Sequence, residues 1–310
     1  MEQKIIMYRN GNYTVTLDRR DGTKIRRLDK GETEFKAAFP ESMDIKICNR
    51  CDMNCSMCHE NSTPDGELGD IMSPSFIDHL RPGTELAIGG GNPLEHPDLE
   101  IFLEKCQRLG LIPSITVNQA HFMQNLELLE KWSARNLIYG LGVSLVFPSP
   151  SFLTAITRFH NAVIHVIAGL VTEWDLEILK ERNLKILILG YKQFRRGSTL
   201  YDKAAQVIEQ RKGDLKRLLP KMIAENWFKV ISFDNLALAQ LGVKEIVEDA
   251  TWEKMYMGDD GSATMYVDMV KREYAVSSTS IRRYPLPDTI DEAFARLPGL
   301  KEREILKFSH

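Results

Sequence analysis

The sequence predicts an α/β fold in which six strand–helix units follow one another, and two observations lead to it. Short runs rich in Ile, Val and Leu recur along the first two thirds of the chain, as expected for strands buried on both faces. Helical stretches separate these runs, which implies right-handed crossovers and a parallel sheet curled into a full or partial barrel. The length of 310 residues fits two domains or one barrel.

The composition excludes several classes of protein. With 43% hydrophobic and 27% charged residues the chain is neither disordered, collagen-like nor a disulfide scaffold, and its net charge of −3 argues against a wholly basic surface for nucleic acid. No apolar run approaches the roughly 18 residues of a membrane span, and the first eleven residues lack an apolar signal-peptide core. We therefore expect a cytoplasmic protein with neither a membrane nor nucleic acid as a partner.

Residues 1–39 are predicted to form a small β appendage. Hydrophobic and polar residues alternate there between turn signals at residues 10–12 and 21–22, and the hydrophobic positions are Ile5, Met7, Tyr13, Val15 and Leu17. The same segment carries a basic stretch that is either solvated surface or a recruitment site for a macromolecule, consisting of Arg19, Arg20, Lys24, Arg26 and Arg27.

Residues 40–200 supply the six units of the main body. Strands are predicted at residues 43–48, 85–88, 114–117, 139–145, 163–167 and 185–189. Helices are predicted at residues 73–80, 98–109, 124–133, 151–158 and 173–182, the first of them begun by Ser73 and Pro74. In such barrels the chemistry lies at the C-terminal ends of the strands.

Residues 201–310 are predicted to form a mixed C-terminal extension that caps the barrel. We expect a helix at 202–225 that breaks near Gly213, a seventh strand at 230–233 and a helix at 236–247. A hairpin of residues 264–268 and 274–278 and a last helix at 290–297 would follow. Because residues 198–310 contain no cysteine, we expect no thiolate-bound metal cluster there.

Four of the five cysteines lie within eleven residues at the end of the first predicted strand. Cys51, Cys55 and Cys58 form a Cys-x3-Cys-x2-Cys loop, and Cys48 precedes it. In a reducing compartment such a group predicts a metal site rather than disulfides. Three thiolates can hold a cubane iron–sulfur cluster and leave its fourth iron free for a substrate or cofactor. Structural zinc is the alternative, although zinc sites usually pair two such hairpins across a spacer, which is missing here.

The cysteine loop resembles that of the radical S-adenosylmethionine (radical SAM) enzymes, and the resemblance extends over roughly residues 40–200. It implies a partial (β/α)6 TIM-like barrel and one [4Fe-4S] cluster with Cys51, Cys55 and Cys58 as its metal ligands. In that family SAM chelates the fourth iron, an electron cleaves it, and a 5′-deoxyadenosyl radical abstracts hydrogen from the substrate. A flavodoxin- or ferredoxin-like protein is then the implied reductant. Met57 occupies a position, often aromatic, whose backbone contacts adenine.

A second motif follows the second predicted strand. The run Gly89-Gly90-Gly91-Asn92-Pro93 resembles the family's Gly-Gly-Glu-Pro, which receives the methionyl ammonium of SAM. Glycine permits close backbone approach, so Gly90 and Gly91 are expected at the cofactor. Asn92 retains a carbonyl acceptor but loses the charge-assisted part of the contact, so we expect weaker anchoring. The resemblance extends to further cofactor contacts at later strands, at Asn118, Ser144 and His165.

Several of these residues keep two interpretations. Cys48 is either a fourth ligand that closes the cluster or a small side chain near the site, from which it could donate a hydrogen atom to a substrate radical. His165 is either a catalyst or a satisfied buried histidine. Asp234 contacts the substrate or caps the helix that follows it. Cys106, on an apolar helical stripe, is predicted to lie in the core.

The substrate is open between two classes. A peptide or protein would suit the appendage, since an extended peptide can pair with added strands. A nucleotide or another phosphorylated small molecule would suit the basic run of Lys192, Arg195 and Arg196, which is otherwise a solvated face. We place the peptide class first. The non-enzyme alternative is an iron–sulfur or zinc protein that uses the barrel for binding or electron transfer.

Overall fold

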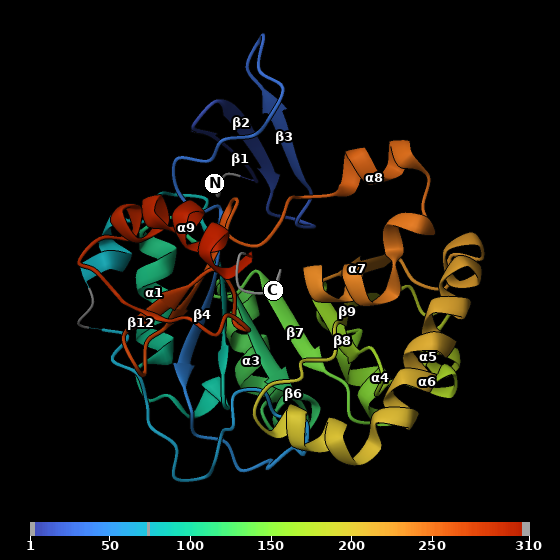
Figure 1. The fold of residues 1–310 in the computed structure, drawn as a ribbon. Coiled ribbons are helices and arrows are strands. Elements are labelled where there is room, and N and C mark those ends of the chain that lie inside the picture. Colours follow the sequence, from blue (N-terminus) through green and yellow to red (C-terminus); the bar gives the residue numbers. More distant parts are fainter. Residues whose placement is uncertain (1–3, 73–74, 306–310) are drawn as a thin grey trace.

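The six predicted strands occupy the centre of an open ten-stranded sheet, in the predicted order (Figure 1). The protein is described from a computed structural model that covers residues 4–72 and 75–305. Neighbouring strands of the six pair in parallel. The strands are β4 (Ser42–Cys48), β5 (Glu85–Gly90), β6 (Ile112–Asn118), β7 (Gly140–Ser144), β8 (Ala162–Ile167) and β9 (Lys185–Leu189). The predicted partial (β/α)6 TIM-like barrel is therefore confirmed as the fold class.

The C-terminal extension widens this sheet at both edges. The predicted seventh strand, β10 (Val230–Phe233), pairs in parallel with β9. On the other side β11 (Thr264–Asp268) pairs in parallel with β4, and β12 (Glu273–Ala275) and β13 (Tyr284–Pro285) follow antiparallel. The predicted hairpin is thus present. Because β10 and β13 are the two edges, backbone pairing leaves the barrel open.

Helices connect the strands, and several differ from the expected ones. The helices are α1 (Leu99–Arg108), α2 (Gln119–Gln124), α3 (Leu126–Ala134), α4 (Pro150–Ile156), α5 (Glu173–Leu179), α6 (Arg196–Ala224), α7 (Asn235–Leu241), α8 (Asp249–Met255) and α9 (Ile290–Ile305), with 3-10 turns η1 (Ser75–His79), η2 (Pro93–Glu95) and η3 (Val243–Glu245). None of the described helices combines the length and the apolarity that a membrane span requires.

Three helix predictions are wrong in ways that have local causes. The helix predicted at 124–133 is present as α3, although it begins two residues later, after the non-helical Asn125. The helix α6 runs through Gly213, and the backbone departs from helical angles at Ala204 instead, because buried residues on either side of Gly213 hold the helix. The helix expected at 236–247 ends at Leu241, since Gly242 adopts the left-handed conformation typical of a helix end. Residues 75–79 form only a 3-10 turn, and the predicted cap at Ser73 and Pro74 lies outside the described residues.

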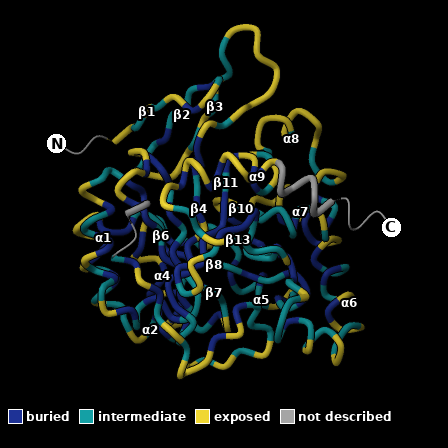
Figure 2. Tube along the Cα trace, turned by 60° about the vertical axis from the view of Figure 1, so that its left-hand side comes forward, coloured by how far each residue is buried: buried dark blue, intermediate teal, exposed yellow. Residues whose placement is uncertain are grey.

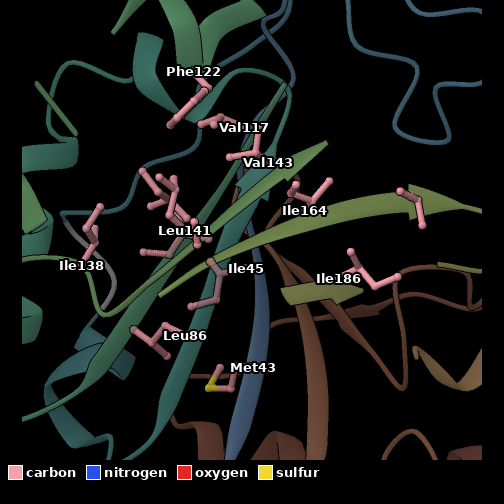
Figure 3. Close-up of a cluster of buried hydrophobic side chains, with 14 of the residues drawn as sticks. Met43, Ile45, Leu86, Val117, Phe122, Ile138, Leu141, Val143, Ile164 and Ile186 are labelled. Carbon is pink, nitrogen blue, oxygen red and sulfur yellow. The ribbon is translucent and has the colours of Figure 1, made fainter. Parts of the chain in front are cut away.

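The hydrophobic core lies between the sheet and the helices. Met43 and Ile45 of β4 lie at most 2% exposed, and equivalent residues of the other strands share this layer (Figure 3). Along a strand successive side chains point to opposite faces, so the residues between them lie on the other, concave face of the sheet. In Figure 2 the buried trace runs through the sheet, while α8 and the segment that follows β3 are largely exposed.

The predicted appendage is a three-stranded antiparallel sheet made of β1 (Ile5–Asn10), β2 (Tyr13–Asp18) and β3 (Lys24–Leu28). It packs on the N-terminal ends of the barrel strands, opposite the arrowhead end of β4 (Figure 1). Part of its basic stretch makes these contacts. Arg26 Nε lies 3.0 Å from Glu41 Oε1, Lys24 Nζ lies 3.4 Å from Glu41 Oε2, and the Arg19 guanidinium lies 4.1 Å from the centre of the Tyr139 ring.

Glu41 should therefore be a large contributor to stability. Its carboxylate is fully buried. It forms ion pairs with Arg26 and Lys24 and accepts a hydrogen bond from the Tyr13 hydroxyl. We expect Glu41→Gln to lower the free energy of unfolding by about 3 kcal/mol, because it removes the buried charge that pairs with the largely buried Arg26, while Lys24 keeps Glu85 as a partner. Asp29→Asn, which breaks the exposed pair with Arg9, should cost less than about 1 kcal/mol. Urea unfolding of both variants tests this, and equal losses would contradict it.

Candidate functional site

A cavity of about 260 Å³ lies at the C-terminal ends of β5 to β9. One wall is the loop after β4, which contributes Cys51, Cys55, Met57 and Cys58. The opposite walls come from strand ends and include Gly90, Gly91, Asn118, Ser144, His165 and Lys192. Residues more than a hundred positions apart thus meet in one space, and they include ten of the thirteen predicted site residues.

The cysteine loop is held by backbone hydrogen bonds. The N–H of Cys51 donates to the carbonyl of Thr63 at 2.9 Å, and the N–H of Thr63 donates to that of Asn49 at 3.1 Å. The N–H of Cys58 donates to the carbonyl of Cys55 at 3.2 Å, which closes a tight turn. Asn54, directly before Cys55, has a φ of 44°, a left-handed conformation that asparagine tolerates better than most residues. The three thiols are half-buried on the cavity wall.

Two arginines at the start of α6 clamp this loop. Arg196 Nη2 donates to the carbonyl of Ser62 at 2.6 Å, and its Nη1 donates to Asn54 Oδ1. Arg195 Nη1 donates to the carbonyl of Glu60 at 2.7 Å. The basic run that suggested a phosphate site therefore uses both arginines within the protein. Only Lys192 and Arg196 of this run line the cavity.

The surroundings of the loop shift the pKa values of the three thiols in different directions. Burial raises the pKa of Cys51 and Cys55. Burial also acts to raise the pKa of Cys58, but hydrogen bonds from the Ser62 backbone and the Arg196 side chain outweigh it and lower that pKa. One end of the loop is thus already arranged to stabilise a thiolate.

A buried group of charges lies beside the loop, and no local sequence pattern indicates it. Lys46 Nζ, 1% exposed, lies 2.9 Å from Glu60 Oε2 and 3.1 Å from Asp268 Oδ2. His59 Nε2 lies 3.3 Å from Glu60 Oε1. Burial acts to raise the pKa of Glu60, but His59 and Lys46 outweigh it, so the pKa lies well below its usual range. This group ties the cysteine loop to β4 and β11.

The glycine segment after β5 packs directly against the cysteine side. The N–H of Gly91 donates to the carbonyl of Cys48 at 2.8 Å, and the N–H of Asn92 donates to that of Arg50 at 2.7 Å. Gly90 has a φ of 119°, which strongly favours glycine. The Asn92 side chain accepts from the N–H of Leu94 and donates to Glu95 Oε1, so it caps η2. Asn92 does not line the cavity.

His165 and Lys192 both line the cavity, and the charge of Lys192 affects His165. Burial and the charge of Lys192 lower the pKa of His165 to about 4, so its imidazole is neutral at pH 7. The ring lies over Gly142, where any side chain would displace it. Lys192 Nζ donates to Ser278 Oγ at 2.9 Å and lies 3.4 Å from His59 Nε2. The Ser278 contact bridges the two sides of the open sheet.

Cys48 and Asp234 lie outside the cavity. Cys48 is fully buried in the hydrophobic cluster, and burial raises the pKa of its thiol to about 11. Asp234 Oδ1 accepts from the N–H of Ala237 at 2.7 Å and from that of Gly190 at 2.9 Å. Of its two interpretations, the helix cap is the one observed. Cys106 is fully buried, as predicted.

His121 is a further neighbour of the loop that sequence reasoning missed. It lies on α2 and is 3% exposed, and its Nε2 lies 2.7 Å from Asp52 Oδ1, next to Cys51. This contact lowers the pKa of Asp52. The two residues lie 69 positions apart, and no local pattern connects them.

The donor set fits a cluster of the kind that the motif indicates. Three thiols share one wall, a cationic guanidinium lies behind them, and the facing glycine wall has open space, since a Cβ added at Gly89 would meet no atom within 4 Å. Soft thiolate ligands suit iron–sulfur clusters and zinc. The same open wall leaves room for a second ligand beside the metal.

Comparison with solved structures finds the fold of SuiB from Streptococcus suis. SuiB bound to its precursor peptide SuiA superposes with a TM-score of 0.57 at 11% identity, over 95% of this chain and 88% of SuiB. SuiB bound to S-adenosylmethionine gives the same score and identity over 95% and 86% of the two chains. No family model and no curated protein sequence matches the chain. The likeness shows the fold, and it agrees with the fold expected from the cysteine and glycine motifs.

The glycine wall should tolerate a methyl group at one position and not at another. A Cβ at Gly91 would lie 2.1 Å from the backbone oxygen of Arg50, whereas one at Gly89 meets nothing within 4 Å. We expect Gly91→Ala to lower the free energy of unfolding by about 1–3 kcal/mol and Gly89→Ala to change it little. Thermal or urea unfolding measures both. Equal stability of the two variants would contradict the placement of this wall.

Proposed function

We propose that this protein is a radical SAM enzyme that acts on a peptide or protein. The observation that carries the proposal is the single cavity that joins three loop thiols to the glycine segment and to polar strand ends. The fold shared with SuiB, which has been solved with S-adenosylmethionine and with a precursor peptide, supports it. When bound, a [4Fe-4S] cluster and SAM would supply a 5′-deoxyadenosyl radical that abstracts hydrogen from the substrate.

The residues of the cavity would then have different roles. Cys51, Cys55 and Cys58 would hold the cluster, with Arg196 balancing their negative charge. The backbones of Met57, Gly90 and Gly91 would contact SAM, and Asn118 and Ser144 offer hydrogen-bonding side chains on the facing strands. His165, neutral at pH 7, can donate or accept one hydrogen bond without adding charge. Asn92 would act indirectly, by holding the glycine segment in place.

The geometry favours a peptide over a phosphorylated small molecule. The two arginines that would have gripped a phosphate are bound to the cysteine loop. A peptide that paired with the appendage would need a long reach, because the appendage lies at the N-terminal ends of the barrel strands (Figure 1) and the cavity lies at their C-terminal ends. The seven residues of β4 span roughly 20 Å. We therefore propose a substrate whose recognition segment and reacting residue are about seven or more residues apart.

Anaerobic reconstitution with iron and sulfide tests the chemistry. The reduced protein should bind iron and convert SAM to 5′-deoxyadenosine, with a flavodoxin- or ferredoxin-like protein or dithionite as reductant. Alanine at Cys51, Cys55 or Cys58 should lower this rate more than about 100-fold, since loss of even an outer partner of a metal ligand costs about 10- to 100-fold. Iron content and the spectrum of the reduced cluster provide the second measurement.

Cys106→Ala is the matched control, because that thiol is buried in the core. It should retain iron and SAM cleavage. An intact, reduced cluster that yields no 5′-deoxyadenosine would favour a binding or electron-transfer protein instead. Zinc without iron in anaerobically purified protein would contradict the proposal.

Cys48 calls for a separate test. Its position outside the cavity supports a cluster with three cysteine ligands. Cys48→Ala should therefore keep the iron and the SAM cleavage rate of the wild type. Loss of iron in this variant would make Cys48 a fourth ligand, and loss of substrate turnover alone would support its role as a hydrogen-atom donor.

A further inference from the structure

Asp44 lies on the concave wall of the barrel below the cavity. On β4 the residues Met43 and Ile45 face the helices, so Asp44 and Lys46 face the other side (Figure 3). Lys46 pairs in register with Gly89, which lines the cavity, and Asp44 pairs with Ala87, two residues earlier on the same strand. Asp44 is thus one step further from the cysteines on the wall that the cavity shares.

Its carboxylate differs from the other acidic groups around it. Glu60 and Asp268 pair with Lys46, Asp234 caps α7, and Asp260 accepts from Asn235 at 2.7 Å. Asp44 is exposed, and within residues 4–72 and 75–305 its side chain has no hydrogen-bond or ion-pair partner.

The wall beside Asp44 leaves space for a ligand. In its row of the sheet Asp44 has Tyr266 of β11 on one side, and small residues on the other, Ala87 on β5, Ser114 on β6 and Gly140 on β7. In the next row towards the cysteines, a Cβ at Gly89 would meet nothing within 4 Å. The open space at Gly89 and the small Ala87 below it therefore lie between the cavity and the exposed carboxylate.

An ionised carboxylate without a partner favours a cation at this point. The Asp44 side chain is exposed to solvent, but the protein atoms that surround it on the concave face partly desolvate the carboxylate and raise its pKa to about 6. Lys192, after β9, opposes the rise, while Asp260, Asp234 and Glu60 add to it from the segment before β11, the start of α7 and the cysteine loop. At pH 7 the carboxylate is ionised, and it is surrounded by three acidic groups and one lysine.

We propose that Asp44 binds a cationic group of the substrate, the ammonium of a lysine or the guanidinium of an arginine. This rests on the proposed function in one respect, that the substrate is a peptide entering the cavity. The cationic side chain passes the open position at Gly89 and ends at Asp44. Its backbone and neighbouring residues are then held near the cysteine end, so Asp44 selects which residue of the peptide is presented.

Binding of short peptides to the reconstituted protein without SAM tests the proposal directly. The probes are acetyl-Gly-Lys-Gly-amide and acetyl-Gly-Arg-Gly-amide, with the norleucine and citrulline peptides as neutral counterparts, and saturation-transfer NMR gives the dissociation constants. We expect a cationic peptide to bind about tenfold or more tightly than its neutral counterpart, a difference that one charged contact supplies. Asp44→Asn should abolish the preference, whereas Glu127→Gln, on the outer helix α3, should keep it.

The pH dependence has a defined direction. Below about pH 6 the Asp44 carboxylate takes up a proton, so the preference should fall by about tenfold per pH unit in the wild type and stay absent in Asp44→Asn. Equal binding of cationic and neutral peptides by the wild type, or an unchanged preference in Asp44→Asn, overturns the proposal. Failure of the proposed radical chemistry would show separately, as absence of 5′-deoxyadenosine.

Thermal unfolding separates binding from a structural role. A raised pKa means that the folded state disfavours the ionised carboxylate, so Asp44→Asn should unfold at the same or a higher temperature than the wild type at pH 7.5. The difference should vanish below about pH 4, where the carboxyl is protonated in both the folded and the unfolded chain. A melting temperature several degrees lower in Asp44→Asn would assign the residue a structural role and overturn the proposal.

Discussion

The alternation of side chains along the parallel strands is the constraint on which this molecule depends. One face of β4 to β9 must bury its Ile, Val and Leu residues against helices, so every other residue is committed to the concave face. Lys46, Thr116 and His165 must therefore lie on the concave face. The strand register therefore decides both which residues line the cavity and which residues form the core. A shift by one residue would move each set of side chains to the opposite face.

The cysteine loop shows how irregular backbone is kept in one shape. It has no regular secondary structure, and its order comes from elsewhere: backbone bonds to Thr63, the glycine segment after β5, and Arg195 and Arg196 at the start of α6. Buried charges add a further tie through Lys46 and Glu60. These supports come from distant parts of the chain, so the loop acquires its shape only when the barrel forms.

Sequence reasoning located what depends on local pattern. Strand positions followed from short apolar runs, and β9 has the predicted bounds, since a buried strand of that composition has few alternatives. Helix ends were placed less well: α7 stops at Gly242, and α6 passes through Gly213, because packing decides whether a glycine ends a helix. Asp234 had two interpretations that only the position of Ala237 resolves.

The sequence by itself determined the fold class and the three cysteines with their spacing, because period and spacing are written in neighbouring residues. It also placed Gly90 and Gly91 at the end of the second strand of the barrel. Tertiary structure alone decided which side chains meet: that Arg196 serves the cysteine loop, that Asn92 turns to cap η2, and that Asp44 is left without a partner. The physical reason is that contacts between distant residues depend on how the strands curve, and no local pattern records that curvature.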